Sequence, residues 1–143
     1  MKKYYAVFDT NVLVSSLLSN RTDSPTVLLL DYVLNGKIVL LYNDEIINEY
    51  NEVLRRDKFD FSDDRIKAVM ELVMTGLSLS RTPSEEEFVD SDDIVFYEVA
   101  LSKEGSYLVT GNQRHFPKSP IVVTPSEMLE IILADGVSYP RKS

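Results

Sequence analysis

Four polar side chains, far apart in the sequence, could together bind a cation. Asp9 follows an apolar run at residues 4–8, and Glu49, Asp93 and Asn112 come later in the chain. Carboxylates that converge on one point repel each other and raise each other's pKa, so such a cluster is stable only when a cation neutralises it. Ligand sets made only of oxygen select hard ions. The expected chemistry is therefore binding of Mg²⁺ or Mn²⁺.

Each of these residues also has a purely structural explanation. Asp9 and Asp93 stand where helices are expected to begin, and the helix dipole favours a carboxylate there. Glu49 fits a boundary position on a surface helix, and Asn112 fits a turn after Thr-Gly. The hypothesis of a metal site therefore rests on the convergence of the four side chains, which only the arrangement of helices and strands can bring about.

Hydrophobic periodicity predicts the elements that would position these residues. Strands are expected at residues 4–8, 37–42, 77–80, 106–110 and 121–124. Helices are expected at residues 10–18, 25–35, 45–56, 64–76, 92–105 and 125–136, with Thr10 or Asn11, Ser24, and Asn43 or Asp44 as N-terminal caps. Short apolar strands separated by helices are typical of a parallel sheet covered on both faces. The prediction is a single three-layer α/β/α domain over residues 1–143, with a mostly parallel sheet of four or five strands.

The carboxyl ends of the strands are the place to look for a site, because ligands of open parallel sheets bind in the crevice there. Asp9 and Asn112 would both face this crevice, since each follows a strand. On a helical wheel, Glu49 lies at the margin of the apolar face of its helix, whereas Glu45 and Glu52 lie on the opposite, solvated side. Glu49 is therefore the glutamate of this helix that can point into a half-buried pocket.

The third carboxylate comes from the helix that follows the acidic loop at residues 81–92. The charges of this loop itself are typical of a solvated surface. Asp93 shares a stripe with Phe96 and Ala100, so it would open the inward face of that helix. Asp92 projects elsewhere, and Asp90 comes one turn earlier. Asp93 is therefore preferred, with Asp90 as the alternative.

Composition limits the classes of protein that the chain can belong to. Its 143 residues suffice for one domain, and 44% hydrophobic with 27% charged residues is ordinary globular composition. No apolar run is long enough to cross a bilayer, which predicts a cytoplasmic protein with no membrane contact. The absence of cysteine excludes thiolate metal sites, and a single histidine excludes a multi-histidine zinc site. A net charge of −8 argues against simple coating of nucleic acid, so a polyanionic partner would need a mediating cation.

Basic residues near the expected crevice could form a local positive rim. Arg114, His115 and Lys118 lie in the loop after the Asn112 turn, and Arg55 and Arg56 end the Glu49 helix. The two arginines also have a structural explanation, because the C-terminus of a helix attracts cations. His115 could contact phosphate, protonate a leaving oxygen, or cap and pack beside its neighbours.

Four segments of the chain resemble one known family. "FDTNVLVSSLL", "EIINEYNEVL", "DSDDIVFYEVALSKEGSYLVTGN" and "RHFP" are similar, in this order, to motifs of the PIN (PilT N-terminus-like) domain, in its bacterial branch of toxins from toxin–antitoxin pairs. The resemblance covers nearly the whole chain. It implies a Rossmann-like sheet and a Mg²⁺- or Mn²⁺-dependent ribonuclease.

The resemblance also implies roles for individual residues. Asp9 matches the first acid of the family and Glu49 its helix glutamate. Asp93 matches the third acid best, with Asp90 next. These three would hold the ion, and either Asp93 or Glu49 would help to deprotonate the attacking water. By the same analogy the products would carry 5′-phosphate and 3′-hydroxyl ends.

Two further positions and the partners follow from the resemblance. Thr10 or Asn11 matches a small polar position, and with Arg114 and His115 it would contact substrate. Asn112 stands where the family often has a fourth acid, so one negative charge is missing. A water or Asp92 would have to replace that acid for a second ion to bind.

The implied partners are RNA, a small antitoxin and a second copy of the chain. The apolar residues at 129–133 and 139–140 could form such an interface, although their spacing also fits core packing.

Other classes of protein are less consistent with the sequence. Phosphohydrolases with an aspartyl nucleophile need a second acid two residues after the first, where this chain has Asn11. A phosphoacceptor receiver domain would have a neighbouring acid pair at its first acid. A dinucleotide-binding domain would have glycines in the first strand–helix turn. The remaining alternative is a non-catalytic, degenerate PIN-like module that binds RNA or protein, and Asn112 is the residue that supports it.

Overall fold

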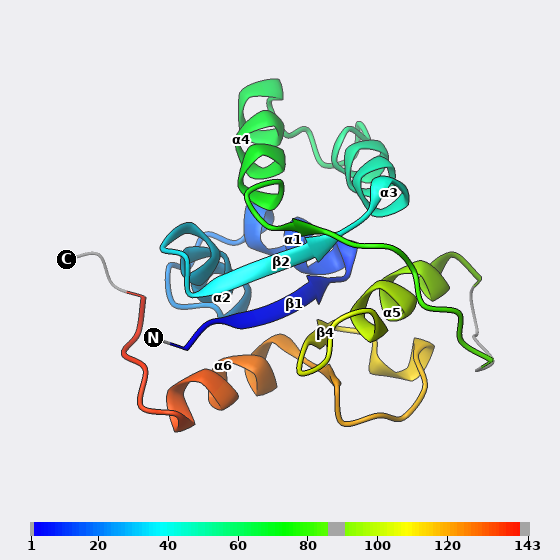
Figure 1. Cartoon of the computed structure of the whole chain (residues 1–143). Coiled ribbons are helices and arrows are strands. Elements are labelled where there is room, and N and C mark those ends of the chain that lie inside the picture. Colours follow the sequence, from blue (N-terminus) through cyan, green and yellow to red (C-terminus); the bar gives the residue numbers. More distant parts are fainter. Residues whose placement is uncertain (1, 86–90, 141–143) are drawn as a thin grey trace.

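A sheet of five parallel strands forms the centre of the molecule (Figure 1). The structure is a computed structural model and describes residues 2–85 and 91–140. The strands are β1 (Tyr4–Phe8), β2 (Ile38–Tyr42), β3 (Leu77–Ser78), β4 (Tyr107–Val109) and β5 (Val122–Val123). They are ordered β3-β2-β1-β4-β5, and all neighbouring pairs are parallel. The prediction of a parallel α/β fold is therefore confirmed.

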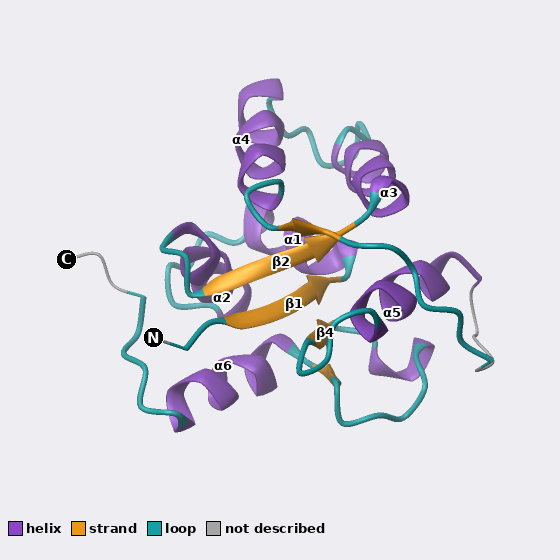
Figure 2. Ribbon diagram, viewed as in Figure 1, coloured by secondary structure: helices purple, strands orange, loops and turns teal. Residues whose placement is uncertain are grey.

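Helices pack against the strands and against one another (Figure 2). They are α1 (Thr10–Leu18), α2 (Pro25–Leu34), α3 (Asp44–Leu54), α4 (Asp63–Val73), α5 (Ile94–Leu101) and α6 (Pro125–Ala134), with short 3₁₀ turns η1 (Ser91–Asp93) and η2 (Gln113–His115). α5 packs across β1, β2 and β4, whereas α2 contacts β2, α1 and α6. α3 and α4 pack together beyond β2 and β3, as Figure 1 shows. Within the described residues, no helix is both long and apolar enough to cross a lipid bilayer.

Burial explains why the central strands are continuous apolar runs. Ala6, Val7 and Phe8 of β1 are completely buried, because elements cover the strand on every side. Gly76 allows the short edge strand β3 to lie beside β2, since a Cβ at this position would be 1.9 Å from the carbonyl oxygen of Leu40. Only glycine therefore fits at residue 76, where the chain enters the sheet.

The ends of the helices follow local sequence signals, with one exception at α1. Ser24 accepts a hydrogen bond from the backbone N–H of Val27, and Asn43 accepts one of 2.9 Å from that of Ile46. The prediction that Thr10 or Asn11 caps α1 is wrong. Asp9 is the N-cap residue, because the helix starts directly after β1, and its side chain makes no capping hydrogen bond. The Asp9 carboxylate is engaged elsewhere.

Two further sequence-based expectations are refined. The helix expected at residues 92–105 is only Ile94–Leu101, preceded by η1 and followed by a turn that reaches Gly105 with φ +84°. Of the apolar residues at 129–133, Ile132 is completely buried, and Leu129 and Ile131 pack against the core. These residues of α6 therefore serve mainly to hold the helix in place.

Candidate active site

Asp9 and Thr110 lie side by side where β1 and β4 end. The two strands are neighbours, with Phe8 paired to Val109, so the residues that follow them leave the sheet together. The chain continues from β1 toward β2 on one side and from β4 toward β5 on the other. Asp9 and Thr110 are therefore at the topological switch point, where parallel sheets bind ligands.

The carboxylate of Asp9 is buried and held by hydrogen bonds. Thr110 donates from its Oγ1 to Oδ2 of Asp9 over 2.7 Å, and both residues are buried, with 6% of Asp9 and none of Thr110 exposed. The backbone N–H of Asn112 in turn donates to Oγ1 of Thr110 over 2.9 Å. Burial raises the pKa of Asp9, while Thr110, the backbone of Thr10 and the charge of His115 act to lower it. A neighbouring cation would stabilise the charged form.

Glu49 reaches the same place from α3. Thr10, the residue after Asp9, donates a hydrogen bond of 3.4 Å from its Oγ1 to Oε2 of Glu49. Burial raises the pKa of this half-buried glutamate, and the nearby charges of Glu52 and Asp92 raise it further against the opposing hydrogen bond from Thr10. The predicted helix geometry is confirmed for Glu52, which is exposed while Glu49 is half-buried. It is wrong for Glu45, which lies one helical turn before Glu49 and lines the same pocket.

A buried tyrosine fixes α3 relative to β1. The hydroxyl of Tyr50 donates to the carbonyl oxygen of Phe8, the last residue of β1, and the side chain is almost completely buried. Burial raises the pKa of Tyr50, and the charges of Asp9 and Glu49 raise it further. The hydrogen bond therefore places Glu49, the residue before Tyr50, beside the end of β1.

Asp93 lies at the start of α5, against His115 of η2. It occupies the N-cap position of α5, with 17% of its side chain exposed, and its Oδ2 lies 3.4 Å from Nδ1 of His115. His115 is also close enough to Asp9 for its charge to lower the pKa of that carboxyl group. Asp93, His115 and Asp9 thus form a connected series. Asp90, the alternative third acid, lies outside the described residues.

Asp92 does not project away from the site, contrary to expectation. It lines a pocket with Glu49, Glu45, Arg81 and Val95, and its charge raises the pKa of Glu49. The short η1 turn precedes α5, so the helical wheel that was extended back to residue 92 does not apply there. Two successive aspartates therefore face the site from different sides.

Arg81 joins the helices that carry the carboxylates. Its Nη1 donates to both carboxylate oxygens of Glu45 on α3, over 3.0 and 2.9 Å, and its Nε donates to Oε1 of Glu98 on α5 over 2.7 Å. Glu98 is buried, and its Oε2 accepts the backbone N–H of Ser84 over 2.7 Å. This ion-pair network holds α3 and α5 together at the wall of the pocket.

Sequence reasoning missed three of these residues. Thr110 gave one signal, because it ends a predicted strand whose carboxyl end was expected to face the same crevice as Asp9, but its contact with Asp9 depends on the strand order. Arg81 and Glu98 gave no comparable signal. Arg81 lies 36 positions from Glu45 and 17 from Glu98, in a segment that reads as solvated surface.

The remaining predicted residues lie in two other pockets. Asn11 and Asn112 are both exposed and line one pocket with Ser15 and Thr26. Arg114 lines another, within the loop between β4 and β5. The structure therefore connects Asp9, Thr10, Glu49, Asp93 and His115 through direct contacts or short-range charge interactions. Asn11, Asn112 and Arg114 line pockets whose described walls include none of these five residues.

The side chains suit a hydrated ion better than a preformed cage. In residues 2–85 and 91–140, no three histidine, cysteine, aspartate or glutamate side chains come close enough together to enclose a metal. The carboxylates offer only oxygen, and burial raises the pKa of both Asp9 and Glu49, so a cation would relieve the cost of their charges. Mg²⁺ commonly keeps several waters and binds through one or two carboxylates. The donor chemistry therefore fits such an ion.

Comparison with known proteins identifies the family. Residues 5–114, well over half of the chain, match the family model of the PIN domain. Searches of the curated proteins and of the solved structures returned no match. The PIN domain is in general a fold of metal-dependent nucleases, and such nucleases use divalent ions. With its switch-point aspartate, its five parallel strands and this match, the chain belongs to the PIN domain family.

Proposed function

We propose that the chain is an endoribonuclease that depends on Mg²⁺ or Mn²⁺ and hydrolyses RNA phosphodiesters. One observation carries the proposal: a buried carboxylate, Asp9, lies at the switch point, and burial raises its pKa. Glu49 is linked to it by the hydrogen bond from the adjacent Thr10, and Asp93 is linked to it by His115, which lies against Asp93 and whose charge acts on Asp9. Such a costly arrangement of charge is typical of functional sites.

Asp9, Glu49 and Asp93 would hold the ion, in part through water molecules. A bound divalent ion would supply Lewis acidity and a water of lowered pKa. Thr10 and Thr110 orient the carboxylates of Glu49 and Asp9 through the hydrogen bonds described above.

A carboxylate would also accept a proton from the attacking water. Glu49, which is half-buried and accepts a hydrogen bond from Thr10, is one candidate for this base. Asp93, which lies against His115, is the alternative. The products would carry 5′-phosphate and 3′-hydroxyl ends.

His115 and the small polar residues would contact the substrate. The side chain of His115 is 45% exposed, so it can contact a phosphate of the RNA while its Nδ1 stays near Asp93. Asn11 and Asn112 line one pocket and would contact the RNA there. Asn112 brings no charge, so we propose one ion, held mainly by the three acids.

A role as the toxin of a toxin–antitoxin pair is a second, finer proposal. An apolar groove between α1, α2 and α4 supports a protein partner, and its rim includes Leu34, which is 72% exposed. Soluble monomers rarely leave large apolar patches uncovered. A small antitoxin is proposed as the partner, with a second copy of the chain as the alternative.

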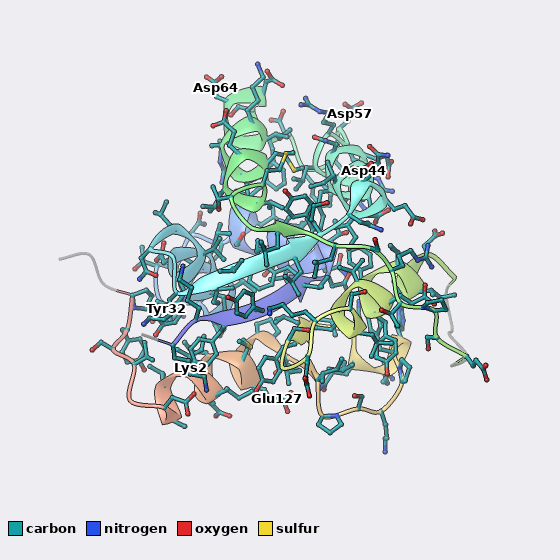
Figure 3. The ribbon with its side chains drawn as sticks, in the orientation of Figure 1. Lys2, Tyr32, Asp44, Asp57, Asp64 and Glu127 are labelled. Atoms are coloured by element: carbon teal, nitrogen blue, oxygen red, sulfur yellow. The ribbon has the colours of Figure 1, made fainter. Side chains whose placement is uncertain are left out.

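The decisive experiment compares Asp9→Asn with a matched control in rigorously purified protein. Mn²⁺-dependent cleavage of single-stranded RNA should disappear in Asp9→Asn and persist in Asp64→Asn, a change of equal charge on exposed α4. Figure 3 shows Asp64 on α4. Equal cleavage by Asp9→Asn and the unmodified chain would refute the assignment. Absence of Mn²⁺-dependent cleavage in the unmodified chain would favour a non-catalytic binding module.

A further inference from the structure

The loop between β4 and β5 forms a pocket that the proposed chemistry does not use. The pocket has a volume of about 630 Å³ and is lined by Gln113, Arg114, Phe116, Pro117, Lys118, Ser119 and Val122. Phe116 and Val122 are buried and give it an apolar floor, whereas Arg114 and Lys118 are exposed. An apolar floor with a cationic rim is complementary to a nucleotide, which pairs an aromatic base with a phosphate.

The pocket carries positive charge on an acidic protein. The chain has a net charge of −8, yet none of the described residues that line the pocket is acidic. Arg114 and Lys118 form no ion pair with any residue of the described ranges, unlike Arg55, Arg56 and Arg81. Their charges therefore remain available to an anionic ligand.

Hydrogen bonds fix one wall of the pocket. The side-chain amide of Gln113 donates to the carbonyl oxygen of Val122 over 3.1 Å and to Oε1 of Glu127 over 3.0 Å. Glu127 belongs to the capping box of α6, and Figure 3 shows its place at the start of that helix. Because α6 packs against α2, the wall of the pocket is tied to the main body of the molecule. Preorganisation of this kind lowers the entropic cost of binding.

The pocket shares the η2 turn with the candidate active site. Arg114 lines the pocket, and the next residue, His115, lies against Asp93. A strand of RNA with one phosphate at His115 can therefore place a neighbouring nucleotide against Arg114.

We propose that this pocket, which we call the loop pocket, binds one unstacked nucleotide of single-stranded RNA next to the scissile phosphate. Its base would lie against Phe116, Pro117 and Val122, and Arg114 and Lys118 would contact phosphate. The loop pocket thus selects single strands over duplex, since a paired base cannot enter it. This inference rests on the proposed ribonuclease function.

The double variant Arg114→Ala/Lys118→Ala tests the loop pocket. Its KM for a single-stranded RNA should rise roughly tenfold with kcat nearly unchanged, and the slope of log K against log salt should fall by about 1.4 for two lost phosphate contacts. Lys3→Ala/Lys58→Ala, which removes the same charge from exposed positions outside the pocket, should behave like the unmodified chain. An equal loss of affinity in both double variants would show only a general charge effect and overturn the proposal.

A binding measurement separates this inference from the proposed function. Fluorescence anisotropy in EDTA, with a labelled single-stranded RNA and its duplex, reports affinity whether or not the chain cleaves. We expect the unmodified chain to bind the single strand more tightly than the duplex. The double variant should lose more affinity for the single strand than for the duplex, because only an unpaired nucleotide seated in the pocket brings its phosphates to Arg114 and Lys118. Equal affinity of the unmodified chain for both forms, or an equal loss for both forms in the double variant, would overturn the loop pocket even if Asp9→Asn abolishes cleavage.

Discussion

Thr110 donates a hydrogen bond to Asp9 across 101 positions of sequence, and both side chains are buried at the shared end of β1 and β4. The hydroxyl of Thr110 also accepts the backbone N–H of Asn112. Thr110 is therefore the residue through which the turn after β4 fixes the orientation of the buried carboxylate.

Replacement of Thr110 by valine should destabilise the protein, because it leaves a buried carboxylate and a backbone N–H without their partner. The free energy of unfolding should fall by about 1–3 kcal/mol, measured by urea denaturation in EDTA. Thr110→Ser keeps the hydroxyl and should lose much less. Equal losses in the two variants would mean that the methyl group, and not the hydrogen bond, matters here.

Asp9→Asn should stabilise the metal-free protein while it abolishes cleavage. Burial raises the pKa of Asp9 above its ordinary 3.8, so the folded state prefers the protonated form and loses stability as pH rises past that value. Asparagine carries no charge at any pH and still accepts from Thr110. At pH 7 the gain should be about 1 kcal/mol, or a few degrees in Tm.

Comparison of two pH values checks the cause of that gain. In EDTA the advantage of Asp9→Asn over the unmodified chain should be larger at pH 7 than at pH 4.5. An advantage that is the same at both values would show that burial of the charge is not its source.

Tyr4 should make stability sensitive to alkaline pH. Burial and a hydrogen bond to Asp135 raise the pKa of Tyr4 to about 12, above the ordinary 10.0. The folded state therefore binds the phenolic proton more tightly than the unfolded state, and this contribution is complete below pH 10 and declines between pH 10 and 12. Thermal unfolding of Tyr4→Phe across this range should show a shallower decline than the unmodified chain. Parallel curves would exclude Tyr4 as the source.

Arg81 and Glu98 should be energetically coupled. Arg81→Ala leaves the buried carboxylate of Glu98 with only the backbone N–H of Ser84, and we expect a loss of about 2 kcal/mol in the free energy of unfolding. In Arg81→Ala/Glu98→Gln the loss should be smaller than the sum of the single losses by 0.5–3 kcal/mol or so. Glu45→Gln removes only the exposed partner and should cost less than about 1 kcal/mol.

The same network should affect the site. Because Arg81 bridges α3 and α5, Arg81→Ala should lower Mn²⁺ affinity, measured by titration calorimetry, and Arg81→Lys should restore only part of it. Mn²⁺ affinity that is unchanged in folded Arg81→Ala would show that the helices keep their spacing without this bridge.

The sequence was sufficient to predict the parallel α/β fold and the positions of Asp9 and Glu49 on their elements, for identifiable reasons. Buried parallel strands have to be apolar along their whole length, as β1 is from Ala6 to Phe8, and an acid directly after such a strand must lie at the carboxyl edge of the sheet. Helical periodicity placed Glu49 at the margin of α3 because Ile46 and Tyr50 must face inward. Local chemistry also predicted the caps Ser24 and Asn43.

Only the tertiary structure decided which side chains meet. Strand order brought Thr110 to Asp9, the η2 turn brought His115 to Asp93, and Arg81 reached Glu45 and Glu98 from a loop without periodicity. The position of Asp92 depended on one 3₁₀ turn that changed the direction of the chain before α5. Hydrophobic periodicity indicates which face of a helix or strand is apolar. Contacts between helices and strands depend instead on register and loop path, because packing of the whole core determines both.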